Sequence, residues 1–202
     1  MPGVAIPAID SRMYFGFLDV VVVEGGALER SILREVLAGF KVRSCKRFAT
    51  TDDTFDYLKH SPAHLLIVGT AEGTMDAYAM IQTIRRLAGN AVRTMPIVLL
   101  TGHTQQSNVL RARDCGASFV VAKPITPAVL YGRIAWLARD RRATIEGGGY
   151  CGPDRRFQSI GPRAGANGRR ATDLSLAVAE TQAPKRSQEE INAMMNPKAI
   201  AL

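Results

Sequence analysis

Residues 64–76 read HLLIVGTAEGTMD and decide how the chain folds. The apolar run at 65–68 has the length of a strand and no polar residue, which is typical of a parallel strand buried on both faces. A short loop follows, and from Asp76 to Leu87 apolar residues recur at helical spacing. The segment therefore predicts a strand, a loop and a helix, with Gly69 where the strand ends.

The same alternation continues on both sides of this segment. Further apolar runs and helical patterns predict strands at 18–23, 42–48, 97–100 and 118–122 and helices at 27–40, 54–60, 104–115 and 126–139. Strands that alternate with helices in this way form an open parallel sheet with helices on both faces. We therefore predict an α/β fold built on a doubly wound, five-stranded parallel sheet.

Composition limits the classes of protein to consider. A chain of 202 residues with 47% hydrophobic residues allows one domain of ordinary size and additional sequence. The three cysteines are widely spaced, which argues against a disulfide framework or a cysteine metal site and favours a reducing, cytoplasmic location. We expect no membrane span, because no run of eighteen apolar residues occurs. We also expect no secretory signal, because a basic segment followed by an apolar core is missing at the N-terminus.

The pattern changes near residue 140. We divide the chain into an N-terminal arm at 1–16, a domain at 17–139, a largely disordered Gly/Arg-rich linker at 140–186 and a short helix at 187–197. Ser187 and Glu190 have the spacing of a capping box. Ile191, Met194 and Met195 would then share one face of an amphipathic helix, which is the kind of segment that binds a partner's groove.

The positive charge is concentrated after the predicted domain. The chain has a net charge of +8, and eight arginines with no lysine lie between residues 139 and 170, Arg155 and Arg156 among them. Arginine pairs well with carboxylates and phosphates. Two interpretations remain open, a solubilising tail and a segment that grips an anion.

Candidate functional residues follow the predicted strands. In an open α/β sheet, ligands bind beyond the carboxyl ends of the strands. The residues at those ends are Glu24 with Gly25, Gly69, Thr101, and Lys123 with Pro124.

This set, with the Met-Asp step at 75–76, resembles the response-regulator receiver (CheY-like) domain of two-component systems. The resemblance covers residues 17–139 and implies a flavodoxin-like fold. In receivers the corresponding positions hold two acids, a phosphate-accepting aspartate, a threonine or serine, and a lysine followed by proline.

The chain departs from the receiver pattern at the positions that accept the phosphoryl group and bind Mg²⁺. Gly69 stands at the position of the phosphate acceptor, and Gly25 replaces one of the two acids that would hold Mg²⁺. Val120 replaces the aromatic residue that moves during switching. We therefore predict a degenerate pseudo-receiver that is not an enzyme, needs no cofactor and does not bind Mg²⁺ tightly. For Lys123, pairing with Glu24 and a purely structural role both remain open.

The resemblance also implies a partner surface over residues 104–139. That surface would carry Arg111, Arg113, Val120, Arg133 and Arg139, whose charge favours an acidic partner. Candidate partners are a histidine kinase, another response regulator or a flagellar or chemotaxis component. Residues 187–196 resemble the docking segment of a flagellar switch protein, and the competing interpretation is a generic amphipathic helix. The alternative function is an arginine-rich protein that binds nucleic acid or lipid on a receiver scaffold.

Overall fold

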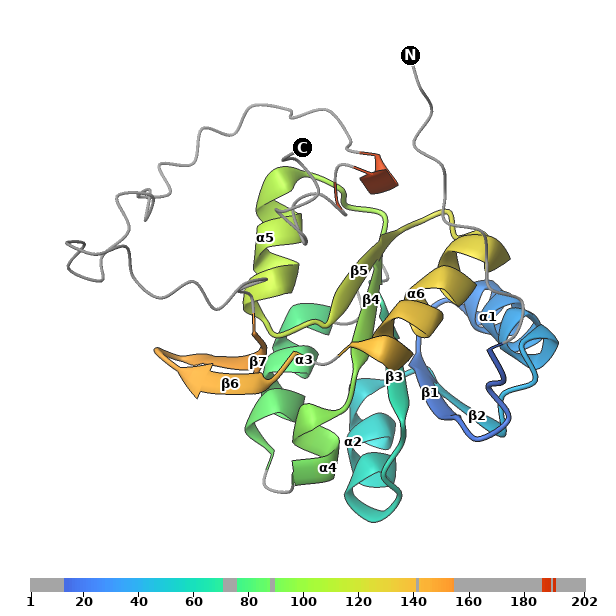
Figure 1. Cartoon of the computed structure of the whole chain (residues 1–202), viewed down its shortest axis with the longest axis horizontal. Helices are drawn as coiled ribbons and strands as arrows, with labels where there is room; N and C mark the ends of the chain where they lie inside the picture. The colour runs from blue at the N-terminus through green and yellow to red at the C-terminus, as the bar shows by residue number, and fades with distance from the viewer. Residues whose placement is uncertain are drawn as a thin grey trace.

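The central sheet of the molecule consists of five parallel strands (Figure 1). The computed structural model describes residues 13–70, 76–87, 90–140, 142–154, 187–189 and 191. The strand order is β2-β1-β3-β4-β5, which is the flavodoxin-like order. The strands are β1 Asp19–Val23, β2 Ser44–Phe48, β3 Leu65–Gly69, β4 Ile97–Thr101 and β5 Phe119–Ala122. The predicted fold class is confirmed.

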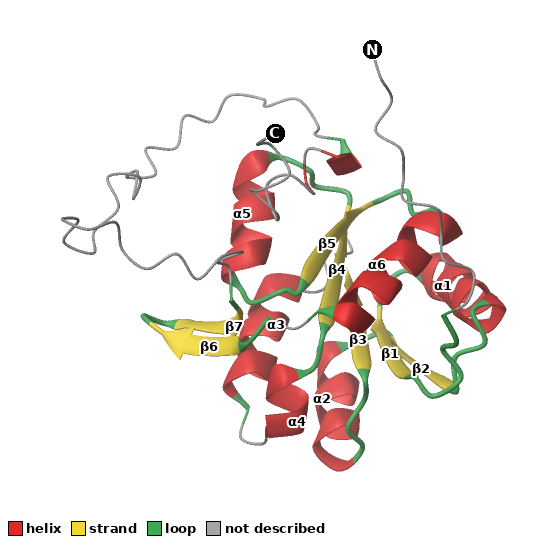
Figure 2. Ribbon diagram, viewed as in Figure 1, coloured by secondary structure: helices red, strands yellow, loops and turns green. Residues whose placement is uncertain are grey.

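Helices cover both faces of the sheet (Figure 2). On one face lie α1 (Ala27–Gly39) and α6 (Pro127–Arg139); on the other lie α2 (Thr51–His60), α3 (Ala77–Arg86) and α5 (Gln106–Asp114), with the short α4 (Asn90–Thr94) beyond α3. Side-chain caps fix three helix starts, because Thr50, Asp76 and Thr126 accept hydrogen bonds from backbone N–H groups of α2, α3 and α6. Among the residues that the structure describes, every helix is too short or too polar to cross a bilayer.

Alternation along the strands divides the core into two layers. Successive side chains of a strand point to opposite faces. Val21, Leu66 and Val120 therefore pack with α2, α3 and α5, whereas Val22, Ile67 and Phe119 pack with α1 and α6. Both layers are fully apolar at the centre, which explains the continuous apolar runs in the sequence.

A β-hairpin follows α6 and corrects one predicted boundary. Strands β6 (Thr144–Gly147) and β7 (Tyr150–Pro153) pair antiparallel, and β7 packs beside α3. Gly148 and Gly149 form the turn at φ values of 58° and 80°, which glycine adopts without strain. The prediction that a linker begins at residue 140 is therefore wrong for residues 144–153. Most of the predicted linker, residues 155–186, lies outside the described residues.

The C-terminal turn, defined as residues 187–189 and 191, returns to the domain. The Ile191 N–H donates to the Ser187 carbonyl over 3.1 Å, which is the hydrogen bond of one helical turn. The Ile191 side chain is 0% exposed and belongs to the same core layer as Val120. Of the predicted apolar helix face, Met194 and Met195 lie outside the described residues. Ile191 packs into this chain's own core instead of remaining free for a partner.

A buried arginine ties the loops at the amino ends of β4 and β5 to α3. Arg85 is 2% exposed, and its guanidinium donates to the carbonyls of Gly116, Arg93 and Met95 over 2.7–3.0 Å and to Ser118 Oγ over 3.3 Å. Burial lowers the pKa of Arg85 to about 10, so the side chain stays charged at neutral pH. Each acceptor would lose its partner if this side chain were apolar.

Replacing Arg85 should therefore destabilise the domain. We expect Arg85→Met to lower the free energy of unfolding by about 3 kcal/mol, because several buried carbonyls would be left unsatisfied. The matched control is Arg86→Met, since Arg86 is the exposed neighbour on the same helix and should change stability by less than about 0.5 kcal/mol. Urea unfolding followed by circular dichroism measures both. Equal midpoints for the two variants would contradict this role for Arg85.

Candidate functional site

The carboxyl ends of β1, β3, β4 and β5 bring the predicted site residues together. Glu24 follows β1, Gly69 and Thr101 end β3 and β4, and Lys123 follows β5. The neighbouring strands pair in the expected register, with Gly69 opposite Leu100 and Thr101 opposite Ala122. Residues 71–75, which follow this edge in the chain, lie outside the described residues.

Glu24 and Lys123 form the central interaction of this edge. Lys123 Nζ donates to Glu24 Oε2 over 2.7 Å, and Glu24 is only 1% exposed. The Gly26 N–H donates to Glu24 Oε1 over 3.3 Å. A buried carboxylate needs a cation or several hydrogen bonds to offset its desolvation, and this one has both. Of the two interpretations of Lys123, pairing with Glu24 is confirmed.

The Glu24 carboxylate occupies the space beside Gly69. A Cβ atom built on Gly69 would lie 1.6 Å from Glu24 Oε2 and 2.5 Å from the carboxylate carbon. No side chain at position 69 fits while Glu24 keeps this conformation. The absence of a side chain at Gly69 is therefore what allows Glu24 to reach Lys123 across the end of β3.

Lys123 and Thr101 are also tied to the loops around the pair. Lys123 Nζ donates to the Thr70 carbonyl over 3.2 Å, and the peptide bond between Lys123 and Pro124 is cis. Thr101 is buried, and its Oγ accepts hydrogen bonds from the Thr70 hydroxyl over 3.3 Å and from the His103 N–H over 3.0 Å. The contact with His103 caps the loop that follows β4.

The side chains of this edge do not fit a magnesium ion. Mg²⁺ binds several oxygen ligands, usually with one or two carboxylates. Among the residues that the structure describes, Glu24 supplies the one carboxylate paired with Lys123, and Gly25 and Gly69 contribute no side-chain oxygen. In the described part of the chain, no three His, Cys, Asp or Glu side chains gather as a metal site.

The predicted partner surface is only partly free. Arg111 is exposed, but its guanidinium lies 4.3 Å from the Tyr78 ring centroid and donates to Asp76 Oδ2 over 3.1 Å. The Tyr78 side chain that Arg111 covers is itself buried, and this burial is the main cause of its raised pKa. Arg113 is half-buried beside Asp114, and Arg139 is exposed at the end of α6.

Two residues of that surface pack into the fold, Val120 fully and Arg133 partly. Val120 is 0% exposed in the layer covered by α5, so its predicted place on the partner surface is wrong. Arg133 is half-buried with its guanidinium 4.7 Å from the Phe119 ring centroid, and burial lowers its pKa. Helices cover β5 on both faces, so Val120 packs beneath α5 and Phe119, which points the other way, meets Arg133 of α6.

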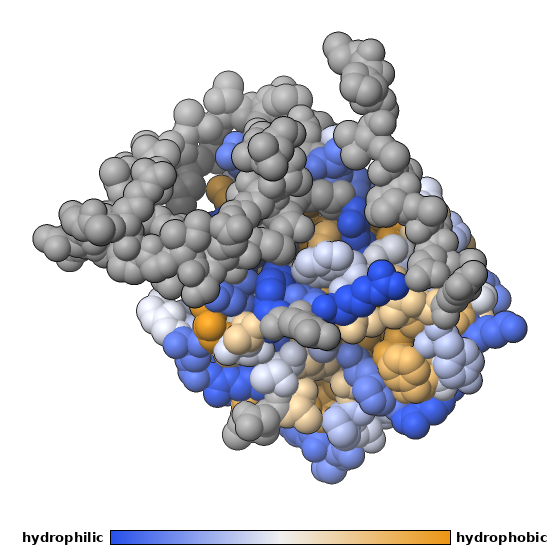
Figure 3. All heavy atoms as spheres, in the orientation of Figure 1, coloured by the Kyte–Doolittle hydropathy of each residue, from blue (hydrophilic) through white to orange (hydrophobic). Residues whose placement is uncertain are grey.

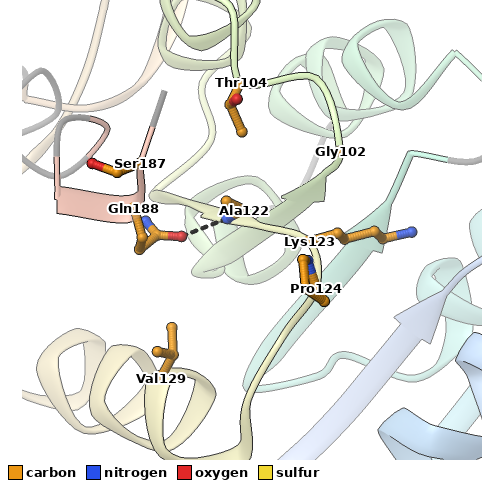
Figure 4. Close-up of a pocket in the computed structure, with 8 residues that line it drawn as sticks. All are labelled: Gly102, Thr104, Ala122, Lys123, Pro124, Val129, Ser187 and Gln188. Atoms are coloured by element: carbon orange, nitrogen blue, oxygen red, sulfur yellow. Dashed lines mark hydrogen bonds between the residues drawn. The ribbon is translucent and has the colours of Figure 1, made fainter. Parts of the chain in front are cut away.

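Gln188 is a contact that the sequence pattern did not indicate. Its side chain points to β5, where Gln188 Oε1 accepts from the Ala122 N–H (Figure 4). Gln188 Nε2 donates to the Val120 carbonyl over 3.2 Å. The Lys123 side chain points the other way, toward Glu24. A pocket of about 320 Å³ lies beside these groups, lined by Gly102, Thr104, Ala122, Lys123, Pro124, Val129, Ser187 and Gln188.

A second pocket lies between α1 and α6. Its volume is about 410 Å³, and its walls are mainly apolar side chains with Glu24 and Lys123 at one end. Leu28 and Ile32 of α1 are exposed by 70% and 50%. Figure 3 shows hydrophobic side chains on the side of the molecule where α1 and α6 lie.

Known proteins resemble this chain in sequence and in fold. The transcriptional regulatory protein GltR of Pseudomonas aeruginosa is 29% identical over 132 residues, which are 64% of this chain. The chain spans about half, 52%, of the length of that relative. A receiver domain of a signal transduction histidine kinase from Syntrophus aciditrophicus superposes with a TM-score of 0.54 at 22% identity, covering 65% of this chain and 98% of that one. The chemotaxis protein CheY4 of Vibrio cholerae superposes with a TM-score of 0.55 at 16% identity, covering 59% and 98%. At these identities the structural matches show the fold alone.

The family assignment rests on the sequence of the sheet and its helices. Residues 20–135, more than half of the chain, match the family model described as response regulator receiver domain. The matched region contains the parallel sheet, apart from the first residue of β1, and the Glu24–Lys123 pair. The chain therefore belongs to the response regulator receiver family of two-component signal transduction.

Proposed function

We propose that this protein is a pseudo-receiver that acts by binding other signalling proteins and does not use phosphorylation as its switch. It is not an enzyme in this proposal, and it works in the cytoplasm without a metal cofactor. The observation that carries the proposal is the position of the Glu24 carboxylate. That carboxylate fills the space beside Gly69 and is held there by Lys123.

The chemistry of phosphoryl acceptance supports this interpretation. A receiver accepts a phosphoryl group on a carboxylate oxygen, and Mg²⁺ offsets the charge that develops. At this edge the remaining carboxylate is buried and paired with the lysine, so its oxygens are engaged. An incoming phosphoryl group would meet negative charge and would lack a metal site formed by acidic side chains.

The region that would transmit a switch is also altered. Val120 is a buried β-branched residue, and branching at Cβ restricts the rotation of its side chain. Thr101 is held by the Thr70 hydroxyl and the His103 N–H. Both features support a domain that keeps one conformation and presents one surface.

We assign partner binding to the face formed by α5, β5 and α6. Arg111, Arg113 and Arg139 lie at or near its surface, so the proposed partner is acidic there. Receivers interact with histidine kinases and other signalling proteins, and a kinase, a second response regulator or a flagellar or chemotaxis component fits this proposal.

Binding to nucleic acid or lipid is less well supported. Arg142, the described arginine after α6, is engaged by Asp140, the Ser118 carbonyl and the Trp136 ring, and Arg155 and Arg156 lie outside the described residues.

A phosphate analogue tests the proposal directly. Beryllofluoride with Mg²⁺ mimics a phosphorylated aspartate, and we expect millimolar amounts to leave the ¹⁵N chemical shifts of Gly69, Thr101 and Lys123 unchanged. Mg²⁺ and fluoride without beryllium provide the background. A receiver domain that retains its acceptor aspartate, measured in parallel, provides the positive control. Saturable shifts at this edge of the sheet would refute phosphorylation independence.

A glycine substitution tests the space that Glu24 occupies. We expect Gly69→Ala to lower the free energy of unfolding by about 2 kcal/mol, because the new methyl group must displace Glu24 from Lys123. The matched control is Gly102→Ala, where a Cβ atom meets nothing within 4 Å. Chemical unfolding of both variants gives the comparison. If both glycines tolerate alanine equally well, Glu24 does not hold the position described here.

A further inference from the structure

The outer edge of β5 is paired with a side chain rather than with another strand. An edge strand presents N–H and carbonyl groups that need partners, and β5 is the last strand of the sheet. The Gln188 amide donates to the Val120 carbonyl and accepts from the Ala122 N–H. These are the two bonds that the N–H and the carbonyl of one residue in an added parallel strand would make. The Gln188 side chain therefore acts as a one-residue strand.

Ile191 supplies a second anchor on the same helical turn. Residues three apart lie on one face of a helix, so Gln188 and Ile191 approach the domain together. Ile191 is 0% exposed, within the layer that also contains Val109, Ala112 and Val120. The glutamine amide binds the backbone of β5, and the isoleucine side chain enters the core. Together they define a sequence motif for binding, Gln-x-x-Ile.

The number of residues between the hairpin and this turn is large enough for the turn to be released and to rebind. Residues 155–186 separate the hairpin from Ser187, and 32 residues can span up to about 100 Å. A tethered segment competes with free ligands at an effective concentration that can reach the millimolar range. A partner that offers the same two groups competes with the turn for the same positions.

We propose that the groove at the edge of β5, between α5 and α6, is a peptide-binding site that this chain's own C-terminal turn occupies and guards. The external partner is a protein helix that presents glutamine followed three residues later by an aliphatic residue. It binds by displacing the Gln188 amide and the Ile191 side chain. This inference rests on the proposed function, because it names how the α5–β5–α6 face binds partners and how that binding is regulated.

A peptide competition on the full chain tests the proposal. The probe is a fluorescent peptide with the sequence of residues 184–197, titrated by anisotropy into the wild type, Gln188→Leu, Ile191→Asp and the control Glu189→Gln, which changes an exposed neighbour. Because displacing the tethered turn costs binding energy, we expect Gln188→Leu and Ile191→Asp to bind the probe at least about tenfold more tightly than the wild type and Glu189→Gln. A probe in which its own glutamine is leucine should bind weakly to every chain.

Hydrogen exchange separates a displaceable turn from a fixed part of the core. In Gln188→Leu, protection of the Ala122 amide should fall about tenfold, whereas Leu99 in the central strand should keep its protection. Equal probe affinity for wild type and variants, no probe binding to the variants, or loss of protection at both amides would each overturn the proposal. Neither assay contains Mg²⁺ or beryllofluoride. A failure here therefore leaves phosphorylation independence standing, and a beryllofluoride response would leave the guarded groove standing.

Discussion

The ion pair between Glu24 and Lys123 is the interaction on which the carboxyl edge of the sheet depends. Burying the Glu24 carboxylate without a partner would destabilise the fold by several kcal/mol. The pairing with Glu24 therefore holds Lys123 in a fixed position. The pair links the end of β1 to the end of β5 across β3, where Gly69 leaves the necessary space. A fold that elsewhere holds a reactive aspartate here holds a closed contact between two of its own side chains.

The closed pair and the C-terminal turn meet at the same strand end. Lys123 directs its side chain toward Glu24, and the preceding residue, Ala122, donates its N–H to Gln188 on the other side of β5. Both neighbours therefore restrain the end of β5 in one arrangement. In this account, the protein is regulated when a partner helix competes with the C-terminal turn for the outer edge of β5. The degenerate phosphorylation pocket makes the end of the sheet rigid and does not act as a switch.

Apolar patterning predicted the sheet and both helical layers because the strands of the parallel sheet other than β2 are buried on both faces. For the Glu24–Lys123 contact the sequence offered one of two open interpretations, because a lysine without the family's aspartate can pair with another anion, and the structure decides between them. The hairpin was missed because its short strands have no periodicity, and the glycines at 147–149 looked like a break when two of them form a tight turn. Gln188 was missed because a polar side chain that completes a strand edge leaves no hydrophobic pattern. Val120 was misplaced on the surface although strand alternation buries it beneath α5.

Phosphoryl transfer from a small-molecule donor tests the central claim most directly. The full chain, incubated with acetyl phosphate and Mg²⁺ and examined by intact mass spectrometry, should keep its unmodified mass, because Glu24 is buried against Lys123 and Gly69 offers no acceptor. A receiver domain with its aspartate, treated in the same way, shows that the donor is active. A stoichiometric phosphoryl adduct that maps to Glu24, or to another carboxylate at this edge of the sheet, would contradict the account.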